Sequence, residues 1–203
     1  MRRQLRGPTP AFLENQWEQW GLEWESRRAS DTAARWNWRS VNGRKVNEEL
    51  ISPLREQAQH HCSFCDAFPV SPPSNETIEH FRPKSKFPRW AWHWPNLFYC
   101  CDFCQSRKKE RWDEALLSPD APEYDFHAYF WADSTNGKIE ILPHLDETAS
   151  HRARTTLDLY GLNHPRHCVQ RLLAQERRSA LPDWPIDGFP YRDYLECGQR
   201  SSA

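Results

Sequence analysis

Apolar residues recur at helical spacing near the start of the chain. One stripe places four of them at i, i+4, i+7 and i+11: Leu13, Trp17, Trp20 and Trp24. Pro10 suits the first turn of a helix, so we expect an amphipathic helix that begins there. Its indole face packs either on the core of this chain or on a partner, because Trp is common in both settings.

Periodicity of the same kind recurs at three later places, near residues 47–59, 149–160 and 165–180. Leu50 and Leu54 fall on the inner face of the first of these helices, and Pro53 either kinks this helix or restarts it. Helices therefore dominate the expected fold.

The strand patterns are shorter. Residues 78–81 and 96–100 are each expected to form a strand, and a helix should follow at residues 105–116. The N-terminal amides of that helix would suit an anion such as a phosphate. This part of the chain therefore predicts a ββα unit.

The C-terminal third carries two further features. Residues 124–132 and 138–142 flank Asn136-Gly137, a dipeptide that tolerates the positive φ of a tight turn, and so predict a β-hairpin. Residues 181–203 combine three prolines with large aromatic side chains, a composition typical of a docking segment. These aromatic residues are Trp184, Phe189, Tyr191 and Tyr194.

Together these elements predict an α+β chain that is mainly helical. Its 203 residues divide into an N-terminal helical region at 1–60, a compact core at 61–118 and a C-terminal region at 119–203. No run approaches the roughly 20 apolar residues of a bilayer span. Residues 1–8 also lack the apolar stretch of a secretory signal. We therefore expect a cytoplasmic protein that does not act at a membrane.

Four of the seven cysteines form two Cys-x-x-Cys pairs, Cys62/Cys65 and Cys101/Cys104. An odd number of cysteines in a reducing compartment argues against a disulfide framework. Four thiolates complete the tetrahedral coordination of zinc, which makes such an ion structural. We therefore expect one structural zinc ion, and Cys100 is not expected to be a ligand because it breaks the spacing.

Residues with catalytic chemistry stand between the two cysteine pairs. Glu79 and His80 supply a carboxylate and an imidazole on adjacent residues, and Asn96 supplies a side-chain amide. A carboxylate that binds a divalent cation and a histidine that accepts a proton from water can together cleave a phosphodiester. An imidazole titrates near neutrality without extreme tuning, so His80 suits the role of base.

The net charge of −1 is unevenly distributed along the chain. Residues 82–111 carry eight Arg or Lys against two acids, so this window is +6 and the remainder is −7. Such a local excess suits a phosphate backbone, whereas a solvated charged face is the alternative. Four residues of the window are expected to hold flanking phosphates: Lys84, Lys86, Arg107 and Lys108.

Four segments together resemble the HNH (ββα-metal) endonucleases: Cys62-Ser63-Phe64-Cys65, Glu79-His80-Phe81-Arg82-Pro83-Lys84-Ser85, Trp94-Pro95-Asn96-Leu97 and Cys101-Asp102-Phe103-Cys104-Gln105-Ser106-Arg107-Lys108. More narrowly, they resemble the PtuB type, the nuclease subunits of Septu anti-phage systems and of retron-associated effector pairs. The general match covers residues 62–108, and the narrower one also draws on residues 159–163 and the helix after them. The resemblance implies a zinc-stapled ββα-metal core, to which the helical flanks and the extra β-hairpin are added.

The resemblance also implies a role for each central residue. His80 matches the general base, Glu79 the ligand of a catalytic Mg²⁺ or Mn²⁺ ion, and Asn96 the residue that fixes the loop and the histidine. Gln105 stands directly after the last cysteine, where the family usually has His or Asn. Its oxygen can bind a hard cation such as Mg²⁺ but is a poorer ligand for softer metals. The second protein ligand, Gln105, therefore departs from the family pattern.

As a partner, the resemblance implies an ABC-type ATPase subunit of the PtuA type, and we expect one of the aromatic flanks to dock on it. The expected substrate is nucleic acid, with DNA favoured over RNA, although phosphate contacts read neither base nor sugar.

Two alternatives remain: a stand-alone restriction-type HNH nuclease, and a non-catalytic zinc-stapled adaptor for nucleic acid or protein. The presence of both Glu79 and His80 argues against the adaptor, which would need only the cysteines. The chain has little room for a separate sequence-reading domain, which argues against the stand-alone enzyme.

Overall fold

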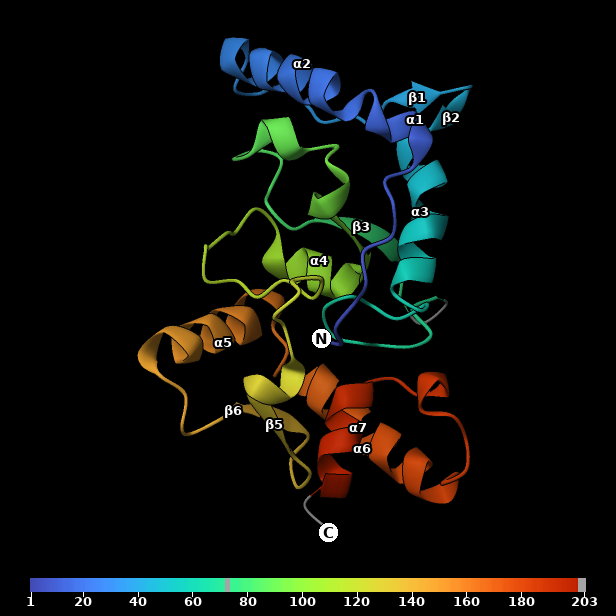
Figure 1. The fold of residues 1–203 in the computed structure, drawn as a ribbon, viewed down its shortest axis with the longest axis vertical. Coiled ribbons are helices and arrows are strands. Elements are labelled where there is room, and N and C mark those ends of the chain that lie inside the picture. Colours follow the sequence, from blue (N-terminus) through green and yellow to red (C-terminus); the bar gives the residue numbers. More distant parts are fainter. Residues whose placement is uncertain (72–73, 201–203) are drawn as a thin grey trace.

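The computed structural model describes residues 1–71 and 74–200, and its fold is α+β and mostly helical (Figure 1). Within these residues the strands pair into separate antiparallel hairpins: β1 (Ser40–Val41) with β2 (Arg44–Lys45), β3 (Glu76–His80) with β4 (Leu97–Cys101), and β5 (Phe130–Asp133) with β6 (Lys138–Ile141). The α-helices are α1 (Ala11–Glu14), α2 (Trp17–Ser30), α3 (Val46–Gln57), α4 (Asp102–Lys108), α5 (Glu147–Tyr160), α6 (Pro165–Ala180) and α7 (Arg192–Arg200). Short 3-10 helices lie at η1 (Pro88–Trp90), η2 (Trp94–Asn96), η3 (Phe126–Ala128) and η4 (Ile186–Gly188).

The central unit is the β3–β4 hairpin followed directly by α4. Thr77 pairs with Cys100 and His80 pairs with Leu97 across the antiparallel ladder. Every residue of β4 is buried, so this strand runs through the core. The two predicted strands are confirmed, with their ends displaced by one or two residues.

The helix predicted at residues 105–116 is wrong at both ends. It begins at Asp102, where the Cys101 sulfur accepts the Cys104 amide N–H and caps the first turn. It ends at Lys108, because Lys109 adopts a φ of 52° outside the helical region. The first turn of α4 therefore faces the cysteines and not a phosphate.

The N-terminal helix predicted from Pro10 is divided into α1 and α2, and its indole face points inward. Trp20 and Trp24 are buried, and the Trp24 indole N–H donates to the carbonyl oxygen of Lys84 at 3.1 Å. In Figure 1, α2 lies across η1 at one end of the molecule. A Cβ at Gly21 would lie 2.2 Å from the carbonyl oxygen of Arg89, so only glycine permits this approach. Packing on the chain's own core is therefore the correct alternative for this stripe.

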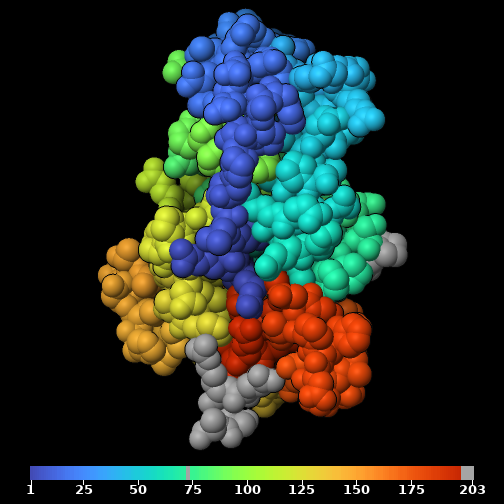
Figure 2. All heavy atoms as spheres, turned by 45° about the vertical axis from the view of Figure 1, so that its right-hand side comes forward, coloured from blue at the N-terminus to red at the C-terminus, as the bar shows by residue number. Residues whose placement is uncertain are grey.

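The first ten residues run along the surface as an extended strap, drawn in dark blue in Figure 2. At one end, the Tyr124 hydroxyl donates to the carbonyl oxygen of Met1 at 2.8 Å. Further along, Arg6 donates to the carbonyl oxygen of Leu97 at 2.7 Å and pairs with Asp120 at 2.9 Å. The strap therefore ties β4 to the region that follows α4.

Helix α3 is continuous, with Pro53 inside it, and Leu50 and Leu54 are buried as predicted. Both predicted C-terminal helices are also confirmed, and α6 has the predicted bounds. Helix α5 begins two residues before the predicted start, because the Asp146 carboxylate accepts the Ala149 amide N–H at 2.7 Å and so caps the helix. The predicted hairpin is confirmed as β5 and β6, although its strands are shorter than expected.

The tail predicted as an extended docking segment instead folds onto the core. It forms η4 and α7, and Phe189, Tyr191 and Tyr194 are buried. Trp184 is the exception among its four aromatic residues, with 55% of its surface exposed. The prediction was wrong because composition does not show which aromatic side chains meet a complementary surface of the same chain. Residues 201–203 of the tail lie outside the described residues.

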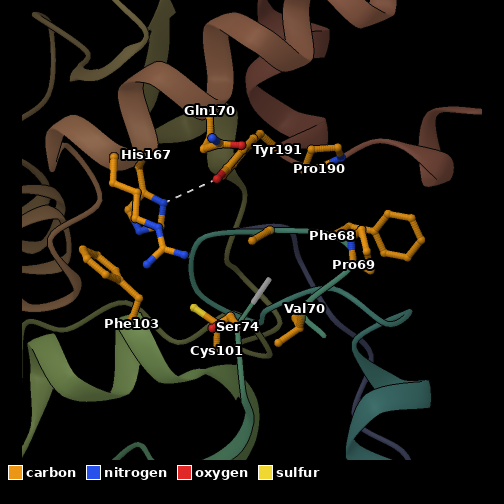
Figure 3. Close-up of a pocket in the computed structure, with 12 residues that line it drawn as sticks. Phe68, Pro69, Val70, Ser74, Cys101, Phe103, His167, Gln170, Pro190 and Tyr191 are labelled. Atoms are coloured by element: carbon orange, nitrogen blue, oxygen red, sulfur yellow. Dashed lines mark hydrogen bonds between the residues drawn. The ribbon is translucent and has the colours of Figure 1, made fainter. Parts of the chain in front are cut away.

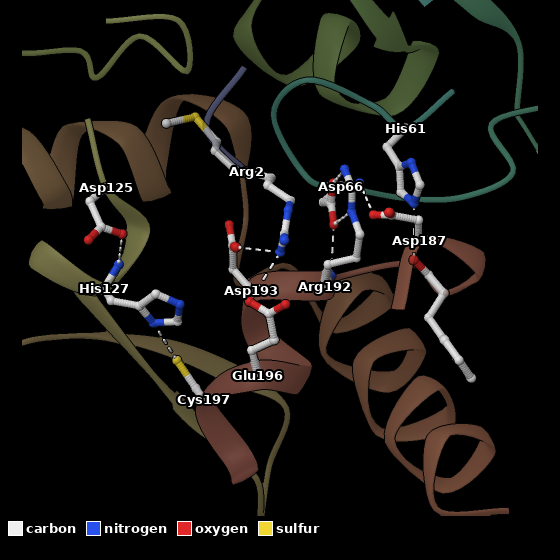
Figure 4. Close-up of polar contacts among 12 residues, drawn as sticks. Arg2, His61, Asp66, Asp125, His127, Asp187, Arg192, Asp193, Glu196 and Cys197 are labelled. Atoms are coloured by element: carbon white, nitrogen blue, oxygen red, sulfur yellow. Dashed lines mark hydrogen bonds and ion pairs between the residues drawn. The ribbon is translucent and has the colours of Figure 1, made fainter. Parts of the chain in front are cut away.

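Two contacts hold the tail on the loop that follows the first cysteine pair. Arg192 forms a bidentate ion pair with the Asp66 carboxylate. Its Nη2 donates to Oδ1 at 2.7 Å, and its Nε donates to Oδ2 at 3.1 Å (Figure 4). The Tyr191 amide N–H donates to the carbonyl oxygen of Asp66 at 2.8 Å. The Tyr191 side chain faces Val70 across a cavity of about 160 Å³, which His167 of α6 also lines (Figure 3). Because a bidentate arginine–carboxylate pair has a defined geometry, it fixes where α7 begins.

We expect Phe189→Ala to lower the free energy of unfolding by about 3–5 kcal/mol, because the ring is fully buried. Trp184→Ala in the same segment should change it by only about 0.5 kcal/mol, since surface substitutions have small effects. Denaturant unfolding of both variants makes the comparison. Small and equal losses would mean that the tail is not part of the folded core.

Candidate metal centre and active site

The four predicted zinc ligands come together in one buried cluster. The cluster consists of Cys62, Cys65, Cys101 and Cys104, whose sulfurs all lie within 4.8 Å of one another. The sulfurs of Cys65 and Cys101 are 3.8 Å apart. Around a tetrahedral zinc ion with bonds of about 2.3 Å, sulfurs are about 3.8 Å apart. The cluster is therefore compatible with a structural zinc site.

Backbone amides support these sulfurs. The Cys101 N–H donates to the Cys62 sulfur at 3.4 Å, and the Cys104 N–H donates to the Cys101 sulfur at 3.5 Å. Cys100 is buried as well, but its thiol donates to the carbonyl oxygen of Cys101 at 3.2 Å and it does not join the four-sulfur group. The four cysteines that the Cys-x-x-Cys spacing predicts as ligands are therefore the four that lie together in the structure.

Glu79 is a buried carboxylate with a buried counter-ion. Lys108 Nζ donates to Glu79 Oε1 at 2.6 Å and to the carbonyl oxygen of His80 at 2.9 Å. Burial raises the pKa of Glu79 to about 7, although the charge of Lys108 opposes this rise. Lys108 was expected to contact a phosphate, but its side chain has no exposed surface. It instead neutralises Glu79.

His80 ends β3 with its imidazole oriented by the backbone. Its Nε2 lies 2.9 Å from the carbonyl oxygen of Ala91, so Nε2 carries the proton and Nδ1 keeps its lone pair. Burial, and after it the charge of Lys84, lowers the pKa of His80 to about 3. The ring is therefore neutral at physiological pH, and the expectation that it titrates near neutrality is wrong for this buried position.

Two indoles from the segment between α2 and β1 cover His80. The Trp38 ring stacks on the imidazole with centroids 5.5 Å apart, and Trp36 meets it edge-on at 5.4 Å. The Lys84 ammonium lies 5.6 Å from the centre of the Trp36 ring. Sequence reasoning missed both indoles, because no spacing rule connects them to a histidine so far along the chain.

Asn96 holds the loop that connects His80 to Ala91. Its Oδ1 accepts the Arg82 amide N–H at 2.7 Å, and its Nδ2 donates to the carbonyl oxygens of Arg82 and Trp90, each at 3.0 Å. Trp90 immediately precedes Ala91, whose carbonyl oxygen orients the His80 ring. These contacts suit the predicted role of Asn96 in fixing the loop and the histidine.

Glu79 and His80 line one open cavity of about 370 Å³. Gln105 lines it as well, and its Nε2 donates to the carbonyl oxygen of Ile78 at 2.9 Å, which orients the amide. The cavity therefore gathers a carboxylate, a neutral imidazole and an amide from β3 and α4. Charged groups at its edge are Lys84, Lys109 and Glu110.

The basic residues predicted to bind phosphate do not share one surface. Lys84 lines the cavity, Lys86 is exposed on the loop after β3, and Arg107 is exposed beside the end of α5. Lys108 is buried. Lys109 lines the cavity but was not singled out, although its place in a basic run was an available signal. Which member of such a run faces a cavity depends on where the helix ends.

Cys104→Ser should abolish zinc binding and give unfolded or insoluble protein, because metal binding energy is folding energy in a small stapled unit. Elemental analysis and circular dichroism measure the two effects. Cys168→Ser is the matched control, since Cys168 is buried but lies outside the cluster. A soluble, folded wild-type protein that carries no zinc would contradict the assignment.

Lys108→Met should lower the free energy of unfolding by about 3–5 kcal/mol, because it leaves the buried Glu79 carboxylate without its partner. Lys86→Met, on an exposed side chain, should leave stability within about 0.5 kcal/mol of wild type. Lys86→Met should instead weaken nucleic-acid binding in a filter assay. If Lys108→Met instead weakened nucleic-acid binding and left stability unchanged, Lys108 would be the phosphate contact.

Comparison of the chain with protein-family models and with curated proteins gives no match. In the part of the chain that the structure describes, no helix is both long enough and apolar enough to cross a membrane.

Proposed function

We propose that the protein is a divalent-metal-dependent nuclease of the HNH type that hydrolyses phosphodiester bonds of nucleic acid. The observation that carries the proposal is the convergence of Glu79, His80 and Gln105 on one open cavity. The β3–β4–α4 unit that presents them is joined to the four-cysteine cluster at Cys101. A carboxylate, an oriented imidazole and nearby ammonium groups are the groups that phosphodiester hydrolysis requires.

His80 is proposed as the general base. The carbonyl oxygen of Ala91 holds the Nε2 proton, which leaves Nδ1 to accept a proton from the attacking water. Asn96 positions the histidine indirectly through the loop that carries this carbonyl. Neutrality of the ring keeps Nδ1 unprotonated, although a pKa of about 3 makes it a weak base until substrate enters.

Glu79 and Gln105 would hold a Mg²⁺ or Mn²⁺ ion, which supplies charge neutralisation at the phosphate and stabilises the leaving oxygen. Their donors are oxygens, which suit these hard cations. In the described residues no three His, Cys, Asp or Glu donors converge at this cavity. That sparse set fits an ion that keeps several waters and takes substrate oxygens. Lys108 meanwhile limits the repulsion between Glu79 and an incoming phosphate.

Three lysine ammonium groups are proposed to hold the nucleic-acid backbone, and one of them, Lys84, is half-buried and pairs with Glu110 at 3.6 Å. Lys84 and Lys109 stand at the cavity, and Lys86 lies on the adjoining loop. Contacts of this kind position a strand without reading its sequence. DNA is the proposed substrate in preference to RNA, and target selection is assigned to a partner.

The proposed partner is an ABC-type ATPase subunit. The buried Trp20, Trp24 and Tyr191 rings cannot form a docking surface, whereas Trp184 still can. Val169 and Leu173 stand one turn apart on α6 and are each about half exposed. Exposed large apolar residues of this kind are common in interfaces. We therefore place the contact with the ATPase on α6 and Trp184.

One observation favours the adaptor without catalysis. His80 is covered by Trp36 and Trp38, and Glu79 already has a cationic partner in Lys108. In an adaptor these groups would serve only to stabilise the hairpin. A cleavage assay with a His80 variant separates the two functions.

His80→Ala should reduce nucleic-acid cleavage by about 10²- to 10⁴-fold, because a general base contributes that much to rate. The assay uses plasmid, single-stranded DNA and tRNA with Mg²⁺ or Mn²⁺, in the presence and absence of the ATPase. His144→Ala, at an exposed position, is the matched control. Zinc content and melting temperature confirm that the variant is folded.

Two results would contradict the proposed function. Cleavage by folded His80→Ala within a few-fold of wild type would remove His80 from the mechanism. Wild-type protein that binds nucleic acid but cleaves none of these substrates, even with the ATPase, would favour the adaptor.

A further inference from the structure

A second cavity adjoins the candidate active site. It has a volume of about 380 Å³ and lies between β3, the N-terminal half of α3 and Trp38. Gln105 lines both this cavity and the one that holds Glu79 and His80. Trp38 also connects the two, because it lines the second cavity and stacks on His80. A group bound in the second cavity therefore lies next to the proposed cleavage site.

The neighbouring rings cover one face of the Trp38 indole and leave the other. His80 stacks on one face, with ring centroids 5.5 Å apart and an angle of 25° between the planes. The Trp36 centroid lies 5.3 Å from that of Trp38 and 5.4 Å from that of His80, so Trp36 stands beside the stacked pair. The outer face of Trp38 is therefore free of both rings, and Trp38 lines the second cavity. An indole face of this kind can stack a nucleobase.

The polar groups of the second cavity are mainly hydrogen-bond acceptors. Glu48 stands in the first turn of α3, where its side chain is exposed. The neighbouring Asn47 has a buried Oδ1 without a hydrogen-bond partner among the residues that the structure describes. The Thr77 hydroxyl already donates to the carbonyl oxygen of Cys100 at 2.8 Å, so this group can only accept from a ligand. A ligand that donates hydrogen bonds therefore complements this cavity.

The two cavities differ in charge. Glu76 lines the second cavity, and its Oε1 accepts from the Tyr99 hydroxyl at 2.7 Å and from Arg55 Nη1 at 3.2 Å, so its charge is partly neutralised. The first cavity has the ammonium groups of Lys84 and Lys109 at its edge. Phosphates are therefore favoured at the first cavity, and an uncharged ring with hydrogen-bond donors is favoured in the second. This division matches the two ends of a nucleotide.

We propose that the second cavity binds one unpaired nucleobase of the substrate, stacked on Trp38, and selects bases that carry an exocyclic amino group. The inference rests on the proposed function and adds a substrate preference to it. The amino groups of cytosine, adenine and guanine donate hydrogen bonds, and a glutamate such as Glu48 accepts from the cytosine amino group. Thymine presents a carbonyl oxygen where cytosine has its amino group, which places one acceptor against another. Strands of thymine should therefore be poor ligands.

The test compares binding of single-stranded oligo-dC and oligo-dT of equal length to the full-length protein. Fluorescence anisotropy measures binding without added Mg²⁺ or Mn²⁺, so that no cleavage is needed. The two bases have rings of the same size, and oligo-dC should bind at least about 10-fold more tightly. Glu48→Ala should reduce this ratio, because it removes the acceptor for the amino group. Glu49→Ala is the matched control, since Glu49 is the next residue of α3, loses the same charge and pairs with Arg44.

Trp38→Ala should weaken binding of both oligonucleotides about 10-fold, because it removes the stacking surface. Trp131→Ala, at a partly exposed indole on β5, is its control. Melting temperature and zinc content show whether each variant is folded, and Glu48→Ala, at an exposed position, keeps the test valid if Trp38→Ala does not fold.

The outcomes separate this inference from the proposed function. Equal binding of oligo-dC and oligo-dT by the wild-type protein, or a ratio that Glu48→Ala leaves unchanged, would overturn the base site and leave the nuclease proposal in place. Binding that follows the expected pattern without cleavage under any condition would overturn the nuclease proposal alone. Failure of the wild-type protein to bind either strand would overturn both.

Discussion

The four-cysteine cluster is the constraint on which the rest of the structure depends. It joins the loop after α3 to the corner between β4 and α4, at Cys62 and Cys101. Because β3 pairs with β4 along its whole length, fixing that corner also fixes the register of β3. Glu79 and His80 end β3 and reach the cavity as a consequence. A zinc ion held by the cluster would add to the apolar burial of this hairpin, because a two-stranded hairpin is marginally stable alone.

The charges beside the cluster are arranged with little solvent to screen them. Glu79 and Lys108 form a buried pair, and such a pair adds little net stability because both groups lose their hydration. The same desolvation keeps His80 neutral, while Ala91 and Asn96 fix the position of its ring. Groups with strongly shifted pKa values that share a cavity are typical of functional sites. Burial therefore shapes the proposed chemistry as much as residue type does.

The two ends of the described chain close the molecule around this centre. The N-terminal strap reaches β4 through Arg6, and the C-terminal tail reaches the first cysteine loop through Arg192 and Asp66. Both segments lack long runs of regular structure, so their stability comes from buried side chains and ion pairs.

Local pattern was enough to predict the cysteine ligand set, the β3–β4 strands, α3, α5 and α6, because each depends on residues close together in the chain. The start of α4 and the burial of the tail were not predictable, since a thiol cap and a distant carboxylate decide them. The burial of Lys108 was not predictable either, because residue type alone indicated a phosphate contact. Sequence by itself determined which chemical groups the chain carries and where its regular elements form. Only the tertiary structure decided which of those groups are desolvated, paired or open to solvent, because these properties depend on neighbours that the chain brings together from far apart.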